Sequence, residues 1–275
     1  MNILFHDVDG CLNAEDGQPI DDDGTTLTAA QAAGMAGLGR AVDASAIDVL
    51  VLNTGRGLDA TLTVARAIGS SRLQYVLAEH GAIGFDVRQQ REIDLGTLAG
   101  RSTSPEVAEA YESLADIHEL LDWYEDTGRK RIAERVGRHV GILAKSANLT
   151  FVTPAGVEQE RMYEAAVALI EKDSPFDAGR FVFHNSFSDG FVDIMCRIDK
   201  GHGVRLITDG EAHGPVRTFG VGNGLNDLPM LREVDVPICP ANSAPEVKDA
   251  CRMRDGHVSE HFYIRATVDW LRTVS

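Results

Sequence analysis

The sequence predicts an α/β protein in which a mainly parallel β-sheet is interrupted by a separate α+β layer. Near both ends of the chain, short apolar runs alternate with helical patterns, which is the order expected of strand–helix–strand units in a parallel sheet. Residues 86–198 combine long amphipathic helix patterns with paired strand-like runs, as an antiparallel sheet covered by helices does. We therefore expect a core made of residues 1–85 and 199–275 and an insertion made of residues 86–198.

The first part of the core is predicted to contain strands and helices in alternation. Residues 3–5 are apolar and too few for a helix, so they suit a buried strand. Residues 28–43 are rich in Ala and place Leu and Met at helical spacing, whereas residues 13–24 are polar and predict a loop. The expected elements are strands at 2–6, 46–52 and 74–78, a short hydrophobic piece at 83–85, and helices at 28–43 and 58–69.

The insertion is predicted as helix–strand–strand repeated twice. Its last two strands flank a turn-forming stretch at 186–190, which is a hairpin signal, and His184 near the hairpin end is a candidate for contact with a substrate. A basic cluster at 129–145 could meet an anionic part of a substrate, but the neighbouring Glu125 and Glu134 favour a solvated helix face. The expected elements are helices at 105–124, 129–136 and 157–172 and strands at 139–144, 149–153, 180–185 and 191–196.

The second part of the core returns to alternating strands and helices. Pro229 is expected in the first turn of a helix, where its missing N–H is tolerated. The expected elements are helices at 202–209 and 268–274 and strands at 216–221 and 235–239.

Composition and charge exclude several classes of function. The formal net charge of −16 argues against partners such as nucleic acid and anionic membranes. The four cysteines have no Cys-x-x-Cys spacing and no nearby pair, so neither zinc nor a disulfide framework is indicated. No apolar run approaches the roughly 20 residues that span a bilayer, and no basic-then-apolar leader precedes the first strand. We expect a cytoplasmic protein.

Two carboxylates follow the first predicted strand. Asp7 and Asp9 alternate along an extended chain end and therefore point the same way. Such a pair repels unless a cation or a shared proton relieves it, and open α/β sheets hold ligands at their strand ends. Because hard oxygen ligands suit Mg2+, the pair indicates a magnesium site. The alternative is a polar Asp-Gly turn that simply ends the strand.

Three further signals lie where other core strands or helices begin or end. Thr54 follows the second strand, and its hydroxyl and the adjacent amides could bind a phosphate oxygen. Lys200 precedes a predicted helix and could aim its ammonium group at a phosphate. Asn223 and Asp227 follow the fourth strand and present oxygens close to Asp7 if the two strands are neighbours. Taken singly, Thr54 could merely shape the turn, and Lys200 is better explained as a surface lysine.

Together, in order, these signals resemble the four motifs of the haloacid dehalogenase superfamily. The matching segments are Asp7-Val-Asp-Gly10, Thr54-Gly-Arg56, Lys200 and Gly222-Asn-Gly-Leu-Asn-Asp227. The spacing resembles the branch that carries an α+β cap between motifs two and three. The resemblance therefore implies a Rossmann-like catalytic core at 1–85 and 199–275 and a substrate-selecting cap at 86–198. Within the superfamily, residues 222–231 and 235–237 look most like mannosyl-3-phosphoglycerate phosphatase.

The resemblance implies a Mg2+-dependent phosphomonoester hydrolase that acts on a small phosphorylated sugar or glycosyl-3-phosphoglycerate. Asp7 would be the nucleophile that forms an aspartyl-phosphate, and Asp9 would be the general acid and base. The implied substrate-binding residues are Thr54, Gly55, Arg56 and Lys200, of which Thr54 and Lys200 also count as catalytic. The implied Mg2+ ligands are Asp7, Asp9 through its carbonyl oxygen, Asn223 and Asp227.

Asn223 departs from the family pattern, which has Asp at this position. An amide oxygen still ligates Mg2+ but brings no negative charge, so weaker metal binding is expected. Two alternatives therefore remain open. The first is a phosphosugar mutase that uses the same chemistry, and the second is a binding protein for a phosphorylated ligand with weakened catalysis. The sequence predicts neither the natural substrate nor the oligomeric state.

Overall fold

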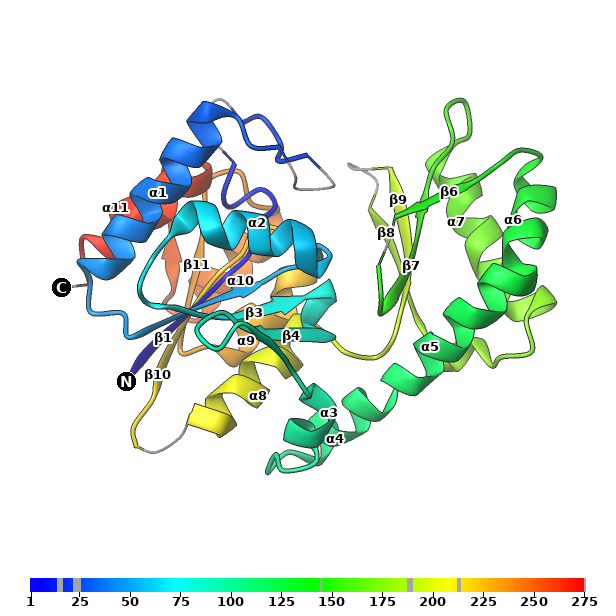
Figure 1. Ribbon diagram of the computed structural model, residues 1–275. Coiled ribbons are helices and arrows are strands. Elements are labelled where there is room, and N and C mark those ends of the chain that lie inside the picture. The colour runs from blue at the N-terminus through cyan, green and yellow to red at the C-terminus, as the bar shows by residue number, and fades with distance from the viewer. Residues whose placement is uncertain (14–16, 22–25, 144, 187–189, 212–213, 275) are drawn as a thin grey trace. The chain divides into compact units, whose positions relative to one another are not determined.

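The computed structural model describes residues 1–13, 17–21, 26–143, 145–186, 190–211 and 214–274. The chain forms two compact units (Figure 1). The first consists of Met1–Val107 and Asp199–Ser275, and the second consists of Ala108–Ile198. The predicted boundary at residue 85 lies earlier than the structural one, because β5 (Arg91–Ile93) pairs with β4 (Ile83–Asp86) and extends the first unit's sheet. The chain leaves the first unit within α4 (Pro105–Glu112).

The first unit is built on an eight-stranded sheet in the order β12-β11-β10-β1-β2-β3-β4-β5. All neighbouring strands from β12 to β3 are parallel, whereas β4 and β5 add antiparallel pairs at one edge. Besides β4 and β5, the strands are β1 (Asn2–His6), β2 (Val49–Asn53), β3 (Leu73–Ala78), β10 (Arg217–Val221), β11 (Val236–Cys239) and β12 (His257–Val258).

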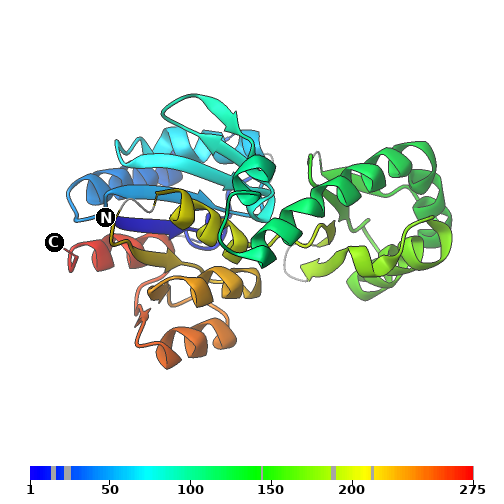
Figure 2. The same ribbon diagram turned by 90° about the horizontal axis from the view of Figure 1, so that it is seen from below.

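The strand order reverses between β1 and β10. From β1 the chain moves outward through β2 and β3, and from β10 it moves outward in the other direction through β11 and β12. Figures 1 and 2 show β1, the dark blue strand next to the N-terminus, inside the sheet. Because ligands of open α/β sheets bind at the carboxyl ends of the strands where the order reverses, this topology places the candidate site after β1 and β10.

Helices cover both faces of this sheet. The helices that precede β2 and β3 lie on one face together with the C-terminal helix. The remaining helices after the insertion lie on the other face (Figure 1). The first group is α1 (Ala29–Asp43), α2 (Leu58–Ile68) and α11 (Tyr263–Leu271), and the second is α8 (Lys200–Glu211), α9 (Leu228–Glu233) and α10 (Pro245–Met253). Shorter helical segments are η1 (Glu79–Gly81), α3 (Leu95–Ala99) and η5 (Leu225–Asp227).

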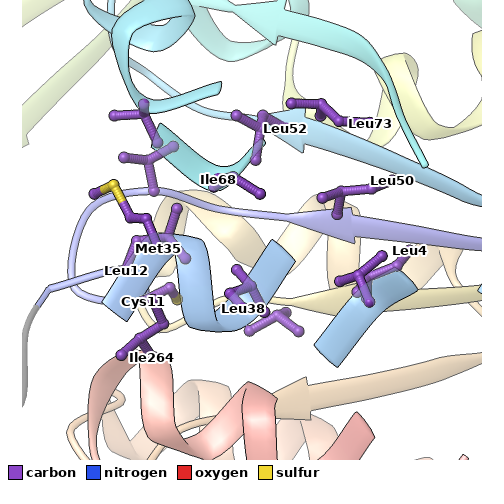
Figure 3. Close-up of a cluster of buried hydrophobic side chains, with 14 of the residues drawn as sticks. Leu4, Cys11, Leu12, Met35, Leu38, Leu50, Leu52, Ile68, Leu73 and Ile264 are labelled. Carbon is purple, nitrogen blue, oxygen red and sulfur yellow. The ribbon is translucent and has the colours of Figure 1, made fainter. Parts of the chain in front are cut away.

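The core of the first unit lies between the sheet and the layer formed by α1, α2 and α11. Leu4, Leu50 and Leu52 point from the strands toward Met35 and Leu38 of α1 (Figure 3), and all five side chains are fully buried. The strand residues are apolar on both faces, as expected for a parallel sheet that helices cover twice. This packing holds the carboxyl end of β1 at a fixed position.

The second unit is a four-stranded antiparallel sheet in the order β6-β7-β9-β8, with helices packed against it. Tyr124 stacks edge-to-face on Phe151, with ring centroids 5.6 Å apart. The strands are β6 (Gly141–Leu143), β7 (Asn148–Val152), β8 (Val182–Ser186) and β9 (Phe191–Met195). The helical segments are α5 (Leu114–Trp123), η2 (Tyr124–Gly128), α6 (Arg129–Val136), α7 (Gln159–Ala168), η3 (Leu169–Asp173) and η4 (Ala178–Arg180).

The predicted fold class, a parallel α/β core interrupted by an α+β layer, is confirmed. Differences are local: the helix predicted at 105–124 is divided between α4 and α5, and the closing helix expected to include residues 268–274 spans Tyr263–Leu271. The basic cluster is paired at its helix end, where Arg129 bonds Glu125 at 2.6 Å. Two predicted segments lie partly outside the described residues. They are the hairpin turn, at residues 187–189, and the first loop with the residue after it, at residues 14–16 and 22–25.

Two further observations concern the described residues alone. None of their helices is long and apolar enough to cross a membrane. All four cysteines are buried and carry free thiols.

Candidate active site

The carboxyl ends of three adjacent strands carry the predicted site residues. Asp7 directly follows β1, Thr54 follows β2 and Gly222 follows β10. The backbone N–H of Asp7 donates to the carbonyl of Val221 at 3.0 Å, which continues the pairing of β1 and β10 by one residue. The sheet therefore brings the first, second and fourth predicted segments to one edge.

Lys200 joins the first and fourth segments inside the protein. Its ammonium nitrogen lies 2.6 Å from Oδ1 of Asp7 and 2.5 Å from Oδ1 of Asp227. Lys200 and Asp227 are completely buried, and Asp7 is nearly so. Burial disfavours the charged amine, but the adjacent Asp227 and Asp7 outweigh this effect and hold the pKa of Lys200 above its ordinary value. The two aspartates therefore favour the charged form of Lys200 in the site.

The same surroundings favour the charged form of Lys200 but disfavour the charged form of Asp7. Burial, followed by the negative charge of Asp227, raises the pKa of Asp7 to about 7, although Lys200 counteracts both. Only Oδ1 of Asp7 bonds Lys200. One buried lysine thus serves two buried carboxylates, Asp7 and Asp227.

Asp227 also shapes the turn after β10. Its Oδ2 accepts hydrogen bonds from the backbone N–H groups of Asn223 and Gly224, at 2.8 and 2.9 Å. Gly222 is required here, because a Cβ atom on it would lie 2.5 Å from the Cβ of Asp227. Since both oxygens of Asp227 accept bonds from the protein, the geometry favours a role in holding Lys200 and the turn over direct metal binding.

Arg56 contacts Asp9 rather than an open substrate position. Its Nε and Nη2 bond the Asp9 carboxylate at 2.9 Å and 2.6 Å, and Nη2 also donates to the carbonyl of Ile20 at 2.8 Å. A further bond joins Nη1 to the carbonyl of Asp21 at 2.5 Å. Arg56 is buried, whereas the side chain of Asp9 is half exposed. The predicted acid and base is thus held by a residue that the sequence assigns to the substrate.

Thr54 and Gly55 form the turn that precedes Arg56. Thr54 is completely buried, and its Oγ1 accepts a hydrogen bond from the backbone N–H of Arg56 at 3.2 Å. The ring of His80 packs so closely on Gly55 that a Cβ atom there would meet it at 2.7 Å. His80 itself has φ +61°, in the left-handed region that favours glycine. Its backbone N–H bonds the carbonyl of Thr54 at 2.8 Å, so this uncommon conformation supports the turn.

Asn223 lies directly against the turn after Asp9. Gly10 has φ +70°, and a Cβ atom on it would lie 2.3 Å from the Asn223 amide nitrogen. The thiol of Cys11 donates to the Asn223 amide oxygen at 3.2 Å. Glycine is therefore needed at position 10 both for its backbone conformation and for the close approach of Asn223.

The donor set fits Mg2+ better than a softer metal. Asp7 has a carboxylate oxygen that Lys200 does not bond, Asn223 brings an amide oxygen to the adjacent turn, and Asp9 brings a carbonyl oxygen. Among the described residues, no group of three His, Cys, Asp or Glu side chains could hold a metal ion. Carboxylate, amide and carbonyl oxygens are the ligands of hard cations, so these residues suit Mg2+ with water completing its shell.

The structure brings all but one of the predicted site residues together in the first unit. Asp7, Asp9, Thr54 and Lys200 lie there with the remaining members, which are Gly55, Arg56, Asn223 and Asp227. The exception, His184, is part of β8 in the second unit, where its Nδ1 lies 3.6 Å from the Asp193 carboxylate. Residues that the sequence pattern did not assign to the site are His80, Cys11, Asn13 and Asn242.

Comparison with known proteins agrees with this geometry. The sequence family described as haloacid dehalogenase-like hydrolase matches residues 160–261, which include Lys200 and the Asn223–Asp227 turn. None of the curated proteins compared with the chain matches it.

Several solved structures share the fold along the whole chain. A haloacid dehalogenase-like hydrolase from Bacteroides thetaiotaomicron is 12% identical, with 100% of this chain and 99% of that chain covered and a TM-score of 0.61. The sucrose-phosphatase of Synechocystis, solved with sucrose and phosphate, is 11% identical, with coverages of 100% and 97% and a TM-score of 0.61. A sugar phosphatase of haloacid dehalogenase subclass IIB is 14% identical, with coverages of 98% and 95% and a TM-score of 0.52.

At these identities the structures establish the fold alone, and the family match covers residues 160–261. Both agree with the prediction of a haloacid dehalogenase-type phosphatase, and neither singles out mannosyl-3-phosphoglycerate phosphatase. Residues 160–261 thus match the model of the haloacid dehalogenase-like hydrolase family, and the whole chain shares its fold with solved structures described in those terms.

Proposed function

We propose that the protein hydrolyses phosphomonoesters with Asp7 as the nucleophile. The observation that carries this proposal is the buried bridge from Lys200 to Asp7 and Asp227, at 2.6 and 2.5 Å. A cation at this position neutralises the oxygens of a phosphoryl group and lowers the repulsion between that group and the attacking carboxylate. Phosphoryl transfer depends mostly on such positioning and charge neutralisation.

In the first step, a carboxylate oxygen of Asp7 attacks phosphorus and the bond from phosphorus to the ester oxygen breaks. Asp9 donates a proton to the departing alkoxide, and an aspartyl-phosphate remains on Asp7. In the second step, Asp9 takes a proton from water, the water oxygen attacks phosphorus, and phosphate leaves with Asp7 regenerated. Asp9 is suited to both steps because it is half exposed and Arg56 fixes its orientation.

Thr54 and Lys200 are proposed to hold the phosphoryl oxygens. Thr54 lies at the end of β2, next to the strand that carries Asp7, and its hydroxyl hydrogen is available because Oγ1 acts as an acceptor toward Arg56. The turn at Gly55 adds backbone N–H groups of the kind that bind anions. Arg56 is occupied by Asp9 and two carbonyls, so we assign it to Asp9 rather than to the substrate.

Mg2+ is proposed as the cofactor, held by the Asp7 carboxylate, the Asp9 carbonyl oxygen and the Asn223 side chain. When bound, it would supply positive charge to the phosphoryl oxygens. Asp227 serves this site by orienting Lys200 and by holding the backbone of Asn223.

We propose a small phosphorylated sugar or a glycosyl-3-phosphoglycerate as the substrate. Two of the solved structures of the same fold are described as sugar phosphatases, and the segment at 222–231 resembles mannosyl-3-phosphoglycerate phosphatase. The second unit is proposed to select the leaving group, with His184 as one candidate contact. The net charge of −16 requires that positive potential for this anionic substrate comes from Lys200 and the metal.

The test is phosphate release from sugar phosphates, glycosyl-3-phosphoglycerates and p-nitrophenyl phosphate, measured with Mg2+ and with a chelator. We expect release only with Mg2+ and none from Asp7→Asn, which keeps the side-chain volume but removes the nucleophilic charge. Asp249→Asn is the matched control, because Asp249 lies exposed on α10. Turnover by Asp7→Asn equal to that of the control would refute the mechanism.

Asn223 supports a second candidate, a binding protein for a phosphorylated ligand. Its amide brings no charge to the site and already accepts a bond from Cys11. Thermal stabilisation by a sugar phosphate without turnover at any Mg2+ concentration would favour this function. A requirement for a sugar bisphosphate, with no net release of phosphate, would instead indicate a mutase.

A further inference from the structure

Gly10, which directly follows Asp9, is surrounded by three asparagine side chains. Oδ1 of Asn13 accepts a hydrogen bond from the Gly10 N–H at 3.1 Å, and Nδ2 of Asn242 donates to the Gly10 carbonyl at 2.8 Å. The amide of Asn223 packs against its Cα. Every polar atom of the Gly10 backbone is thus bonded to a side chain, and two of these asparagines have no role in the proposed chemistry.

Asn13 fixes the peptide group between Asp9 and Gly10. This peptide is planar, and in its trans form the N–H of Gly10 and the carbonyl of Asp9 point to opposite sides. The bond from the Gly10 N–H to Asn13 therefore sets the direction of the Asp9 carbonyl oxygen. That oxygen is the proposed main-chain ligand of Mg2+.

Asn242 fixes the next peptide group, and its own orientation is determined by a third residue. Its Oδ1 accepts a hydrogen bond from the backbone N–H of Tyr263 at 3.0 Å. Because the amide oxygen faces this donor, the amide nitrogen must face the Gly10 carbonyl. Tyr263 has φ +50°, an uncommon conformation for a bulky residue, and such conformations persist where the surrounding structure holds them.

The loop that carries Asn242 also holds the fourth segment. The backbone N–H of Ala244, two residues further on, donates to the carbonyl of Asn223 at 3.0 Å. One loop between β11 and α10 therefore bonds both turns that carry proposed Mg2+ ligands. The Asp9 turn and the Asn223 turn are thus anchored to the same loop.

We infer that Asn13 and Asn242 are positioning residues that preorganise the Asp9 carbonyl and Asn223 for Mg2+. The inference rests on the metal site of the proposed function, but it concerns binding and not turnover. Residues that orient metal ligands without touching the metal commonly contribute a factor of about 10 to 100 in affinity. We place Asn13 and Asn242 in that class.

The test is calorimetric titration of the purified full chain with Mg2+ in the absence of substrate. Asn13→Ala and Asn242→Ala should each raise the Mg2+ dissociation constant about tenfold or more. Asn2→Ala is the matched control, because the Asn2 amide donates to the carbonyl of Ala46 at the same 2.8 Å from the opposite end of β1. A purely structural role predicts that all three variants lower the melting temperature and leave Mg2+ affinity unchanged, which would overturn the inference.

Two conservative variants keep the test decisive if an alanine variant does not fold. Asn13→Asp retains an acceptor for the Gly10 N–H and should bind Mg2+ at least as tightly as the unaltered protein. Asn242→Asp retains the acceptor for Tyr263 but loses the donor to Gly10, so its affinity should fall despite the added negative charge. The opposite order of these two variants would refute the inference.

The outcomes separate this inference from the proposed function. Mg2+ binding that is weakened in the variants, with no phosphatase activity in the unaltered protein, would support the inference and refute the function. Absence of Mg2+ binding by the unaltered protein would refute the metal site and the inference with it.

Discussion

The guanidinium group of Arg56 holds both carboxylate oxygens of Asp9, at 2.6 Å to Oδ1 and 2.9 Å to Oδ2. The side chain of Arg56 is 7% exposed, whereas the side chain of Asp9 is 51% exposed. The arginine is therefore the fixed partner, anchored by the carbonyls of Ile20 and Asp21, and the aspartate is the partner that solvent reaches.

Arg56→Lys tests whether this contact orients Asp9, the proposed general acid and base. Lysine keeps the charge but does not reproduce a two-point contact with a carboxylate. We expect kcat to fall about tenfold or more, since acid–base catalysis contributes a factor of roughly 10² to 10⁴, and the pH dependence of kcat to change. Arg66→Lys, at an exposed position of α2, is the control. An unchanged pH profile with unchanged kcat would contradict the role of Arg56.

Replacing Lys200 by methionine should strongly destabilise the folded protein. The change leaves Asp7 and Asp227 buried side by side without their cation, and removal of one partner of a buried ion pair costs about 3 to 5 kcal/mol. Urea unfolding at pH 8 measures the loss. The double variant Lys200→Met with Asp227→Asn removes one of the two charges and should recover a large part of it. Equal stability of the single and double variants would show that repulsion between the carboxylates is unimportant.

Asn223→Asp should tighten Mg2+ binding and make the metal-free protein less stable. The new carboxylate would share the site with Asp7 and Asp227, which already share the charge of Lys200, while a charged ligand holds a hard cation more strongly than an amide does. We expect about a tenfold lower Mg2+ dissociation constant and a melting temperature that rises more steeply with Mg2+ than in the unaltered protein. An unchanged titration would exclude residue 223 as a ligand.

Two glycines of α1 should respond oppositely to substitution by alanine. A Cβ atom on Gly39 would lie 2.0 Å from the carbonyl oxygen of Ile68, a backbone atom that has little room to move, whereas on Gly37 it would meet only the tip of Arg40 at 3.8 Å. Alanine is the better helix former by about 0.8 to 1.0 kcal/mol. Gly37→Ala should therefore stabilise the protein and Gly39→Ala should destabilise it, as measured by urea unfolding. The same sign for both would contradict the close packing of α1 on α2.

The folded protein should become less stable as the pH is lowered, because His6 is buried in its neutral form. Its Nδ1 donates to the carbonyl of Asp7, and Nε2 accepts from the hydroxyl of Thr267. Burial is the main cause that lowers the pKa of His6 from 6.5 to about 4. Above pH 6.5 the stabilisation is complete, and it is lost as pH falls from 6.5 to 4, because only the unfolded chain then takes up the proton.

Each pKa unit corresponds to about 1.4 kcal/mol, so the loss amounts to about 3 kcal/mol. The free energy of unfolding of the unaltered protein minus that of His6→Gln should decrease by this amount between pH 7.5 and pH 4. A difference that does not vary with pH would show that His6 titrates normally in the folded protein.

The strand ends that carry the site follow from local sequence, but the contacts of the site do not. Asp7, Thr54 and Gly222 each end a short apolar run, and parallel strands must place their carboxyl ends at one edge, so their proximity was predictable. The bond from Asn242 to Gly10 joins residues 232 positions apart, and no periodicity encodes such a pair. The Arg56–Asp9 contact likewise depends on which of several nearby groups the guanidinium reaches.

Element prediction failed where elements are too short to show a period. β12 contains two residues and β5 three. Both are shorter than the four to eight residues over which alternation of apolar and polar residues indicates a strand. Missing β5 also displaced the domain boundary, since this strand keeps the chain in the first unit as far as Val107. The helix α10 was also not predicted, although Pro245 in its first turn and the helical spacing of Val247, Ala250 and Cys251 are signals present in the sequence.

The central place of β1 in the sheet has a consequence during translation. β2 is available to β1 soon after synthesis begins, but the other neighbour, β10, begins at Arg217, which is roughly 10 to 40 seconds later at ordinary elongation rates. Throughout that interval one edge of the apolar strand β1 is open to pairing with other chains. A ribosome that stops between Lys200 and Arg217 releases a chain with Asp7, Thr54 and Lys200 but without β10 or Asp227, so premature termination there yields an aggregation-prone chain rather than a partly active enzyme.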